Sequence, residues 1–394
     1  MSSILYITYD GLLEPLGSSQ VLPYVLELAS LGFQMEVLSF EKEFPEAEIQ
    51  KMKERLSARG VIWTPRQYHN RPSLPATIFD IVVGISHALS RARLCRGLIV
   101  HARSYLPALM GLPAKKLGAR LLFDTRGLWV DERIESGHWS ADSLVVKLAR
   151  MAEKACVREA DYFVHLTSKT QDGLAKNVPG VQLAPFEVIP TCADLARFTP
   201  PKDLREARSK VGLPDRPTLV HSGTISGWYL SDLTFQVGAE FVNRTGGTFL
   251  VLTREEELAR ELSVKHGVEA VVRSVPPSEM GDWLQACDAG IALVRPSFAK
   301  TASCPTKVGE YLGAGLAVGV TSRVGDLDVQ LGGSDVAVVV SAEESAETIV
   351  SKLLSAIATP ERATEARRIS LDIWDLNRGV AKYSGIYTSL GQFT

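Results

Sequence analysis

The sequence predicts an α/β fold made of two tandem Rossmann-like domains. Short apolar runs rich in β-branched residues alternate with longer amphipathic segments along the whole chain, and this alternation is typical of parallel sheets covered by helices. The alternation stops once, in a stretch rich in proline and charge at residues 191–215, and then starts again. We therefore expect a linker there, and 394 residues suffice for two domains that each bury a core.

The first domain is expected to hold seven strands. The apolar runs that predict them are residues 4–9, 35–40, 61–64, 98–103, 120–126, 162–167 and 187–190. Several are apolar on both faces, as buried parallel strands are. Helical spacing of apolar side chains predicts helices between them, one carrying Val21, Leu22, Val25, Leu26 and Leu28, and another carrying Val145, Leu148, Met151, Ala152 and Ala155.

The second domain is expected to hold six strands, at residues 218–222, 248–253, 268–275, 290–295, 317–321 and 336–340. The predicted domains span residues 1–195 and 203–370. Residues 371–394 carry Trp374, Leu376, Val380, Tyr383, Ile386, Tyr387 and Leu390 at roughly helical spacing, so we expect a terminal helix that crosses back to the first domain. Open α/β domains bind ligands at the carboxyl ends of their strands, which places the function in the loops facing a cleft between the domains.

Composition excludes several classes of protein. Lys and Arg number 43 against 45 Asp and Glu, a net charge of -2, whereas a dedicated nucleic-acid binder is usually strongly basic. The five cysteines are at least 17 positions apart, which indicates neither a CxxC metal site nor a disulfide framework. The sequence shows no basic start followed by an apolar run and no uncharged apolar stretch of about 18 residues. We expect no signal peptide, no spanning helix and a cytoplasmic location.

Two segments of the first domain carry candidate site residues. The loop DGLLEPLGSSQ, residues 10–20, follows the first strand; Gly17 permits tight backbone geometry, and Ser18 or Ser19 can cap a helix whose free N–H groups face an anion or a sugar hydroxyl. It lacks the GxGxxG pattern of dinucleotide binding, and an ordinary loop is the alternative.

The second of these segments is FDTRGLWVDE, residues 123–132, where Asp124 and Arg126 follow a buried strand. His101 and Arg103 end the neighbouring strand. Charges in such places are costly unless they are paired or used, so the cluster predicts a site. For His101 by itself, a satisfied core histidine is the alternative.

The second domain carries two further motifs. In the loop SGTISGWYL, residues 222–230, Gly223 and Thr224 lie where backbone amides can meet a diphosphate. In KTASCPTKVGEYLGAG, residues 300–315, Pro305 starts a helix with Lys307 in its first turn and Glu310 on the same face. A cation there opposes the helix dipole unless an anion is bound, which indicates a phosphate beside Lys307, and Glu310 suits a ribose diol. The alternative is a surface ion pair between the two.

The pattern P-x-K-x-x-E-Y-L-x-x-G-x-x-V, from Pro305 to Val318, resembles the donor-binding helix of GT-B glycosyltransferases of family 4, and the resemblance spans nearly the whole chain. It implies a retaining, hexosyltransferase-type enzyme of polysaccharide biosynthesis that needs no metal or other cofactor. The donor is a UDP- or GDP-sugar on the second domain, and the acceptor, on the first, is a saccharide, a lipid-linked molecule or a small molecule. The resemblance assigns donor contacts to Gly17, Ser18, Gly223, Thr224, Arg254, Lys300, Thr306, Lys307 and Glu310, and catalytic roles to His101, Asp124, Arg126 and Lys307.

The sequence departs from the family pattern at two positions. Ala302 stands eight positions before Glu310, where the family usually has a second glutamate, and Arg126 stands where many members have a histidine. The donor sugar therefore stays open. The alternatives are a nucleotide-sugar epimerase of the same fold and a non-catalytic sugar- or nucleotide-binding module; the missing GxGxxG disfavours an NAD-dependent dehydrogenase.

One stretch of the first domain is unusually basic. Residues 81–123 contain no Asp or Glu but hold Arg91, Arg93, Arg96, Arg103, Lys115, Lys116 and Arg120. We expect segment 91–120 to make a peripheral contact with an anionic membrane at its inner face, or with a phosphate-bearing acceptor. An ordinary solvated surface is the alternative.

Overall fold

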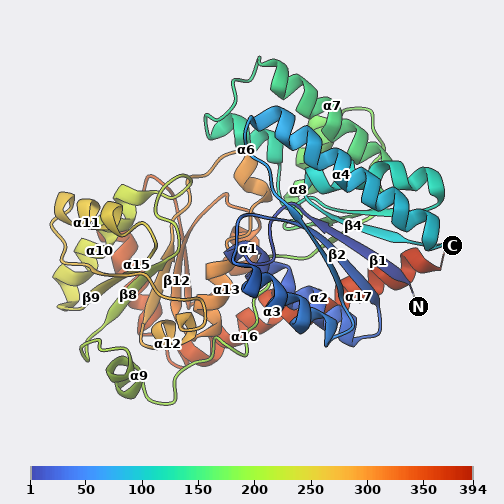
Figure 1. Ribbon diagram of the computed structural model, residues 1–394. Helices are drawn as coiled ribbons and strands as arrows, with labels where there is room; N and C mark the ends of the chain where they lie inside the picture. The colour runs from blue at the N-terminus through green and yellow to red at the C-terminus, as the bar shows by residue number, and fades with distance from the viewer. Residues whose placement is uncertain (1, 393–394) are drawn as a thin grey trace. The chain divides into compact units, whose positions relative to one another are not determined.

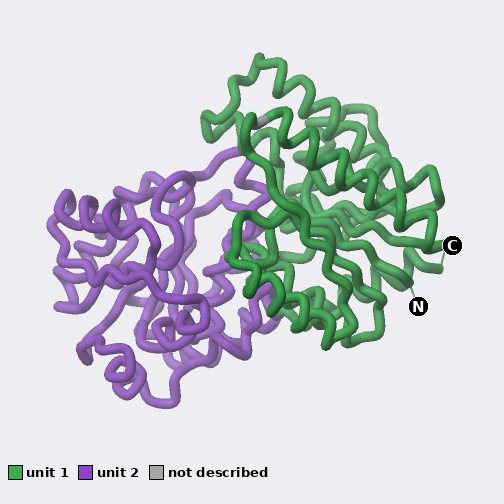
Figure 2. The backbone as a smooth tube through the Cα atoms, in the orientation of Figure 1, with its two compact units in different colours: residues 1–190, 376–394 green, residues 191–375 purple. Residues whose placement is uncertain are grey.

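The computed structural model describes residues 2–392 as an α/β chain (Figure 1). It divides into two compact units, unit 1 comprising residues 1–190 and 376–394 and unit 2 comprising residues 191–375 (Figure 2). The last helix, α17 (Leu376–Gly391), belongs to unit 1, where it contacts α2 and β4. Within the described residues, none of the helices combines the length and apolarity needed to cross a bilayer.

Unit 1 is built on a seven-stranded parallel sheet in the order β3-β2-β1-β4-β5-β6-β7. Its strands are β1 (Ser3–Thr8), β2 (Gln34–Glu41), β3 (Ile62–Gln67), β4 (Ile99–Arg103), β5 (Arg120–Asp124), β6 (Tyr162–His165) and β7 (Phe186–Val188). Tyr6 in β1 is in register with Val37 on one side and His101 on the other. The parallel arrangement brings the ends of β1, β4 and β5 to one edge of the sheet.

The helices of unit 1 cover both faces of this sheet. They are α1 (Pro15–Gln20), α2 (Leu22–Ser30), α3 (Glu46–Ser57), α4 (Ser73–Leu94), α5 (Tyr105–Gly111), the 3₁₀ helix η1 (Leu112–Leu117), α6 (Trp129–Glu135), α7 (Leu144–Glu159) and α8 (Lys169–Asn177), with α17. Figure 1 places α4 and α7 on one side of the sheet and α2 and α17 on the other.

Helix α7 is present as predicted, but the apolar stripe that predicted it faces solvent. Val145, Leu148 and Met151 are exposed, whereas the packed face consists of Val146, Ala149, Glu153, Cys156 and Val157. Both faces of this helix carry apolar residues at helical spacing. The face with small side chains fits closely against the neighbouring elements, and Glu153 is tolerated there because Arg150 donates a 2.7 Å hydrogen bond to it.

Unit 2 is built on a six-stranded parallel sheet in the order β10-β9-β8-β11-β12-β13, the strand order of a Rossmann fold. Its strands are β8 (Thr218–Ser222), β9 (Thr248–Leu252), β10 (Val271–Arg273), β11 (Ala289–Ala292), β12 (Ala317–Thr321) and β13 (Ala337–Val340). Its helices are α9 (Leu204–Lys210), α10 (Ser231–Thr245), α11 (Glu256–Lys265), α12 (Met280–Gln285), η2 (Ala299–Ala302), α13 (Thr306–Gly313), α14 (Leu327–Leu331), α15 (Ala346–Ile357) and α16 (Arg362–Trp374). The two parallel sheets confirm the predicted fold class.

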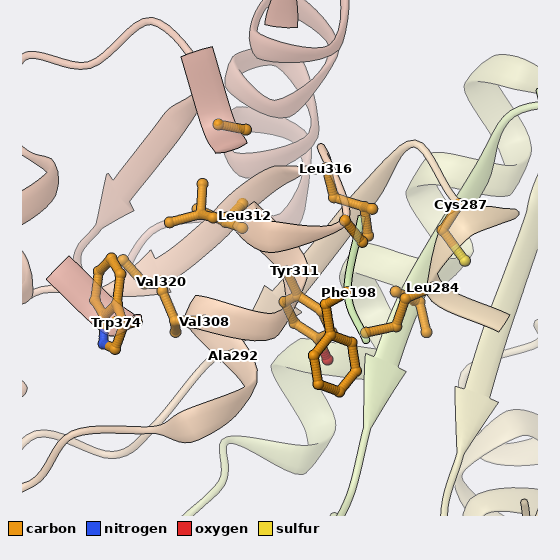
Figure 3. Close-up of a cluster of buried hydrophobic side chains, with 14 of the residues drawn as sticks. Phe198, Leu284, Cys287, Ala292, Val308, Tyr311, Leu312, Leu316, Val320 and Trp374 are labelled. Carbon is orange, nitrogen blue, oxygen red and sulfur yellow. The ribbon is translucent and has the colours of Figure 1, made fainter. Parts of the chain in front are cut away.

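The core of unit 2 fixes helix α13 against the sheet (Figure 3). Tyr311 is fully buried, and its hydroxyl accepts a 2.7 Å hydrogen bond from the backbone N–H of Ser222 at the end of β8. Trp374 packs so closely on α13 that a Cβ at Gly309 would lie 2.7 Å from its Cβ and Cγ atoms. Because α13 is held from both sides, its first turn stays beside the loop that follows β8.

Candidate donor site

Lys307, in the first turn of α13, is the central residue of the candidate site. It is 8% exposed, and among residues 2–392 no hydrogen-bond acceptor meets its Nζ atom. The Nζ lies 3.9 Å from the ring centroid of Tyr229. Burial lowers the pKa of Lys307 to about 7, although Glu310 and Glu255 oppose the shift. A buried ammonium without an acceptor is unfavourable by itself, and an anion at the start of the helix would satisfy it.

Glu310 lies one turn further along the same helix. Burial raises the pKa of its carboxyl to about 7, although Lys307 and Arg197 favour the charged form. Within the described chain, Glu310 and Lys307 form no ion pair, and Lys307 is buried rather than on the surface. The surface-pair alternative is therefore wrong, and two titratable groups with shifted pKa values lie on one face of a helix, as is frequent at functional sites.

The loop between β8 and α10 lies next to Lys307. Gly223 has a φ of +86°, and a Cβ placed on it would lie 3.5 Å from the Nζ of Lys307. The Nε2 atom of His221 lies 3.0 Å from the carbonyl oxygen of Thr224. The left-handed backbone at Gly223 favours glycine and keeps side-chain bulk away from the ammonium. The predicted residues Gly223, Lys307 and Glu310 are thus brought together in unit 2.

Glu255, just after β9, holds this loop in place. Its carboxylate accepts hydrogen bonds from the backbone N–H groups of Ile225 (2.6 Å) and Ser226 (3.0 Å) and from the Ser226 hydroxyl (2.5 Å). Burial opposes ionisation, but these hydrogen bonds lower the pKa of Glu255. Glu255 was not among the predicted residues, although the sequence shows this acidic side chain three positions after Leu252, the last residue of β9.

The remaining residues of unit 2 that were predicted to bind the donor are Arg254, Lys300 and Thr306. Arg254 is exposed. Lys300 is buried, and its Nζ lies 4.2 Å from the centroid of the Trp228 ring, over which the guanidinium of Arg295 also lies at 5.1 Å. Thr306 is the first residue of α13. Ala302 is fully buried in η2, so this packed position has no room for the second glutamate of the family pattern without repacking.

Unit 1 brings the predicted residues Asp124 and Arg126 together at the ends of its central strands. The Arg126 guanidinium lies 3.8 Å from the carboxylate of Asp124 and donates a 2.9 Å hydrogen bond to Gln20. Burial opposes ionisation of Asp124, but Arg126 and His101 lower the pKa of its carboxyl. Arg103 donates to Asp10 at 2.6 Å and to Gln20 at 2.9 Å. The cations of this cluster are therefore already paired.

His101 lies inside unit 1. It is fully buried, its Nδ1 is 2.6 Å from the hydroxyl of Tyr387, and its ring is 4.2 Å from that of Tyr6. Burial lowers the pKa of His101, which keeps the ring neutral, although Asp124 opposes the shift. This environment favours the core-histidine interpretation over a catalytic role.

The loop at residues 10–20 differs from the prediction in one respect. Ser18 and Ser19 do not cap a helix, because α1 begins at Pro15 and their hydroxyls donate to its carbonyl oxygen at 3.1 and 2.6 Å. Gly17 has a packing role: a Cβ there would lie 1.9 Å from the carbonyl oxygen of Gly11. Proline at the first helical position starts the helix earlier than the serines would have.

The loop of unit 1 is also held by a carboxylate. Glu41, at the end of β2, accepts hydrogen bonds from the backbone N–H groups of Leu12 (2.8 Å) and Leu13 (3.3 Å). The hydroxyl of Ser39 donates to the same carboxylate at 2.5 Å.

Among the residues that the structure describes, no group of His, Cys, Asp and Glu side chains is arranged to hold a metal ion.

The basic stretch of unit 1 finds its counter-charges elsewhere in the sequence. Arg91 pairs with Glu36 at 2.6 Å, and Arg103 pairs with Asp10. Lys115 and Arg120 both pair with Asp161, at 2.8 and 3.3 Å. Four of its seven cations are therefore compensated, and segment 91–120 is not the unpaired basic patch that its sequence indicated.

Comparison with known proteins finds similarity to glycosyltransferases. A family model described as "Glycosyl transferase 4-like domain" matches residues 18–192. The chain is 23% identical over 365 residues to the D-inositol 3-phosphate glycosyltransferase of Rhodococcus jostii (strain RHA1), covering 88% of this chain and 79% of the relative. The corresponding enzyme of Rhodococcus opacus (strain B4) is 22% identical over 365 residues, covering 88% of this chain and 80% of the relative.

Solved structures share the fold over the full length. Sucrose-phosphate synthase (tll1590) from Thermosynechococcus elongatus superposes with a TM-score of 0.74 at 14% identity and covers 100% of both chains. Anabaena Alr3699/HepE in complex with UDP-glucose has a TM-score of 0.73 at 14% identity, covering 99% of this chain and 100% of its own. Residues 18–192 therefore match a glycosyl transferase 4-like domain, and the whole chain has the GT-B fold of these solved structures.

Proposed function

We propose that this glycosyltransferase uses a UDP- or GDP-sugar as its donor and binds the nucleotide diphosphate at the first turn of α13 in unit 2. The observation that carries the proposal is the buried, unpaired Nζ of Lys307 beside Gly223. An incoming phosphate would supply the missing acceptor, and the first N–H groups of α13 would add further donors. The neighbour Alr3699/HepE, whose fold the chain shares, is described in complex with UDP-glucose and with UDP.

Glu310 would bind the ribose of the donor. Its carboxylate lies on the same face of α13 as Lys307 and can accept two hydrogen bonds from a diol. A charged carboxylate so close to a diphosphate is tolerated because the ribose hydroxyls separate the two and satisfy it. Burial raises the pKa of Glu310, and hydrogen bonds from the ribose hydroxyls would favour its charged form.

The chemistry that we propose is transfer with retention of the anomeric configuration. The bond between the anomeric carbon and the diphosphate oxygen breaks, the sugar gains oxocarbenium character, and negative charge grows on the leaving phosphate. Lys307 stabilises that charge, and the effect is greatest in a buried site. The acceptor oxygen forms its bond on the same face of the sugar while its proton passes to the leaving phosphate. This step requires neither a protein base nor a metal ion.

Unit 1 would bind the acceptor: a saccharide, a lipid-linked molecule or a small molecule. Asp124 and Arg126 are the catalytic or positioning candidates there, since they lie at and just after the end of β5, 3.8 Å apart, and Arg126 also donates a hydrogen bond to Gln20. The proposed peripheral membrane contact through segment 91–120 rests on Arg93, Arg96 and Lys116, the three cations of that segment outside the four carboxylate pairs.

Calorimetry with UDP, GDP, TDP and ADP tests the donor site. The wild-type protein should bind one of these nucleotides, and Lys307→Ala and Glu310→Ala should each weaken binding by about 10- to 100-fold, as the loss of a charge-assisted hydrogen bond does. Lys352→Ala is the matched control, because Lys352 pairs with Glu344 on another surface of unit 2. Unchanged binding in both site variants would show that the site is wrongly assigned.

Donor turnover then separates an enzyme that transfers from the other functions of the fold. Slow hydrolysis of the correct nucleotide-sugar, with release of a sugar of unchanged anomeric configuration by NMR, is the expected result. Inversion would exclude the retaining mechanism, and an epimerised nucleotide-sugar would indicate an epimerase. Tight nucleotide binding without any turnover would indicate a binding module.

A further inference from the structure

Exposed apolar side chains are concentrated in unit 1. Of the 17 large hydrophobic residues that are exposed among the described residues, 14 belong to unit 1 and three to unit 2. Eight of the 14 lie on the first halves of two helices: Leu74, Ile78, Phe79 and Val82 on α4, and Leu144, Val145, Leu148 and Met151 on α7. Single exposed apolar residues are ordinary, but two such groups on neighbouring helices mark an interaction surface.

The outer face of α7 combines an apolar stripe with cations. Leu144 and Met151 are 70% and 68% exposed, and with Leu148 they follow the spacing of one helix face. Lys147 and Lys154 are exposed next to this stripe. The only acidic residue between positions 144 and 158 is Glu153, which is buried and paired with Arg150. An apolar stripe bordered by lysines is typical of helices that lie in a membrane interface, and the acidic residues near this stripe, Asp142 and Glu159, stand before the start and at the end of α7.

Helix α4 repeats the arrangement at lower charge. Leu74, Ile78 and Val82 follow each other at intervals of four, so they share one face, and all are about half exposed. The only acidic residue of α4, Asp80, is buried and accepts a 2.8 Å hydrogen bond from Tyr9. The outer face of α4 is therefore apolar and carries no negative charge.

The two helices present these faces on the same side of unit 1. Both contact α5, whose residues are mostly buried, and Figure 1 shows α4 and α7 running alongside each other over one face of the sheet. We name the exposed residues of the two stripes, together with Lys147 and Lys154, the α4–α7 face. This face points outward, because the opposite sides of both helices pack against the rest of unit 1.

We propose that the α4–α7 face docks on the surface of an anionic lipid bilayer. The apolar stripes would enter the boundary between headgroups and acyl chains, and Lys147 and Lys154 would contact anionic headgroups. Charge favours a bilayer over a second copy of the chain, because a copy would bring lysines against lysines, whereas anionic lipid complements them. The contact lies outside segment 91–120, in which four of the seven cations are paired within unit 1.

Vesicle flotation tests this surface independently of donor binding, since it needs no nucleotide. The wild-type protein should float with vesicles of phosphatidylcholine and phosphatidylglycerol and remain behind with phosphatidylcholine alone. Leu148→Glu with Met151→Glu should lower recovery by about tenfold or more, because both charges would have to enter the interface. Lys147→Gln with Lys154→Gln should reduce recovery and its dependence on phosphatidylglycerol.

The matched control is Val264→Glu with Val329→Glu, at positions 85% and 80% exposed in unit 2, which should float like the wild type. All substituted side chains are exposed, so thermal melting should show that each variant is folded. Equal recovery of the wild type with both kinds of vesicle, or unchanged recovery of Leu148→Glu with Met151→Glu, would overturn the proposal. A dimer that Leu148→Glu dissociates in light scattering would assign the face to a second copy instead. The triple variant Arg93→Gln, Arg96→Gln and Lys116→Gln should float like the wild type. If it lost recovery while the double variant Lys147→Gln and Lys154→Gln kept it, the membrane contact would lie in segment 91–120 instead.

Discussion

The two units hold the loop after their first strand in the same way. In unit 1, Glu41 at the end of the second strand binds the backbone N–H groups of Leu12 and Leu13. In unit 2, Glu255 just after the second strand binds those of Ile225 and Ser226. In each unit a carboxylate orders a loop that would otherwise leave its N–H groups unsatisfied.

The units differ in the cations next to these loops. In unit 1, Arg103 and Arg126 are paired with carboxylates and Gln20. In unit 2, the Nζ of Lys307 has no acceptor among the described residues. The two cations of unit 1 are therefore paired within the chain, whereas the ammonium of unit 2 is not. Removing a cation should therefore have opposite effects on the stability of the two units.

The largest effect is expected from Arg126→Met in unit 1. The substitution would leave the carboxylate of Asp124 buried without its nearest cation, and breaking a buried ion pair in this way typically costs about 3–5 kcal/mol. Urea denaturation of the protein without ligands would measure the loss. Asp124→Asn combined with Arg126→Met removes both charges and should recover part of it; a double variant as unstable as the sum of the two single ones would contradict the pairing.

The opposite effect is expected from Lys307→Met in unit 2. Replacing a buried, unpaired ammonium with an apolar side chain of similar length should stabilise the ligand-free protein by about 1–4 kcal/mol at pH 7. The same variant should lose nucleotide binding. Thermal melting would measure the change in stability, and calorimetry would measure the loss of nucleotide binding. A variant less stable than the wild type would contradict the prediction, because it would show that Lys307 stabilises the ligand-free fold.

A third prediction concerns the pH dependence of stability, which should differ for Lys307 and Glu310, the two titratable groups of α13. The pKa of Lys307 is lowered by burial to about 7, so between about pH 7 and 10.5 the unfolded chain binds the proton that the folded one lacks, and stability rises with pH. The pKa of Glu310 is raised by burial to about 7, so between about pH 4.5 and 7 the folded chain binds the extra proton, and stability falls as pH rises. Each slope is at most about 1.4 kcal/mol per pH unit.

Melting curves across pH 5–10 would measure these slopes as differences from variants. Relative to Lys307→Met, the wild type should gain stability above about pH 7; relative to Glu310→Gln, it should lose stability from about pH 5 to 7. Nucleotide binding at pH 8.5 should take up protons, because a bound diphosphate restores the charge of Lys307. Calorimetry in buffers of different ionisation enthalpy would detect this uptake, and equal heats in all buffers would contradict it.

Most of the fold could be predicted because buried parallel strands are apolar on both faces. Each of the thirteen apolar runs lies on a strand, from β1 to β13, although the run at residues 268–275 is strand only over Val271–Arg273. The apolar stripe of α7 could not be assigned to a side from its spacing, because Val146, Ala149, Cys156 and Val157 form a second stripe on the opposite face. The neighbours that choose between them come from distant parts of the sequence.

The site could be predicted where its chemistry is local. Lys307 and Glu310 share one turn of helix, and the sequence shows both the cation in the first turn and its spacing from the carboxylate. The contact of Glu255 with Ile225 could not be predicted, because the two are 30 positions apart in the sequence and only the parallel pairing of β8 and β9 brings them together. The pairing of Lys115 and Arg120 with Asp161 was hidden for the same reason.

The smallest effect is expected from Glu255→Ala, which tests whether the ordered loop of unit 2 serves the donor. The variant would lose three hydrogen bonds to residues 225 and 226 and leave the Gly223 loop free to move away from Lys307. Since Glu255 would touch the loop and not the nucleotide, we expect nucleotide affinity to fall by about 5- to 10-fold, the equivalent of one hydrogen bond. Glu41→Ala, which loosens the corresponding loop of unit 1, is the matched control and should leave nucleotide affinity unchanged while lowering the melting temperature. Calorimetry on both variants measures the nucleotide affinity. If Glu41→Ala weakened binding as much as Glu255→Ala does, the loop of unit 2 would have no special role in binding the nucleotide.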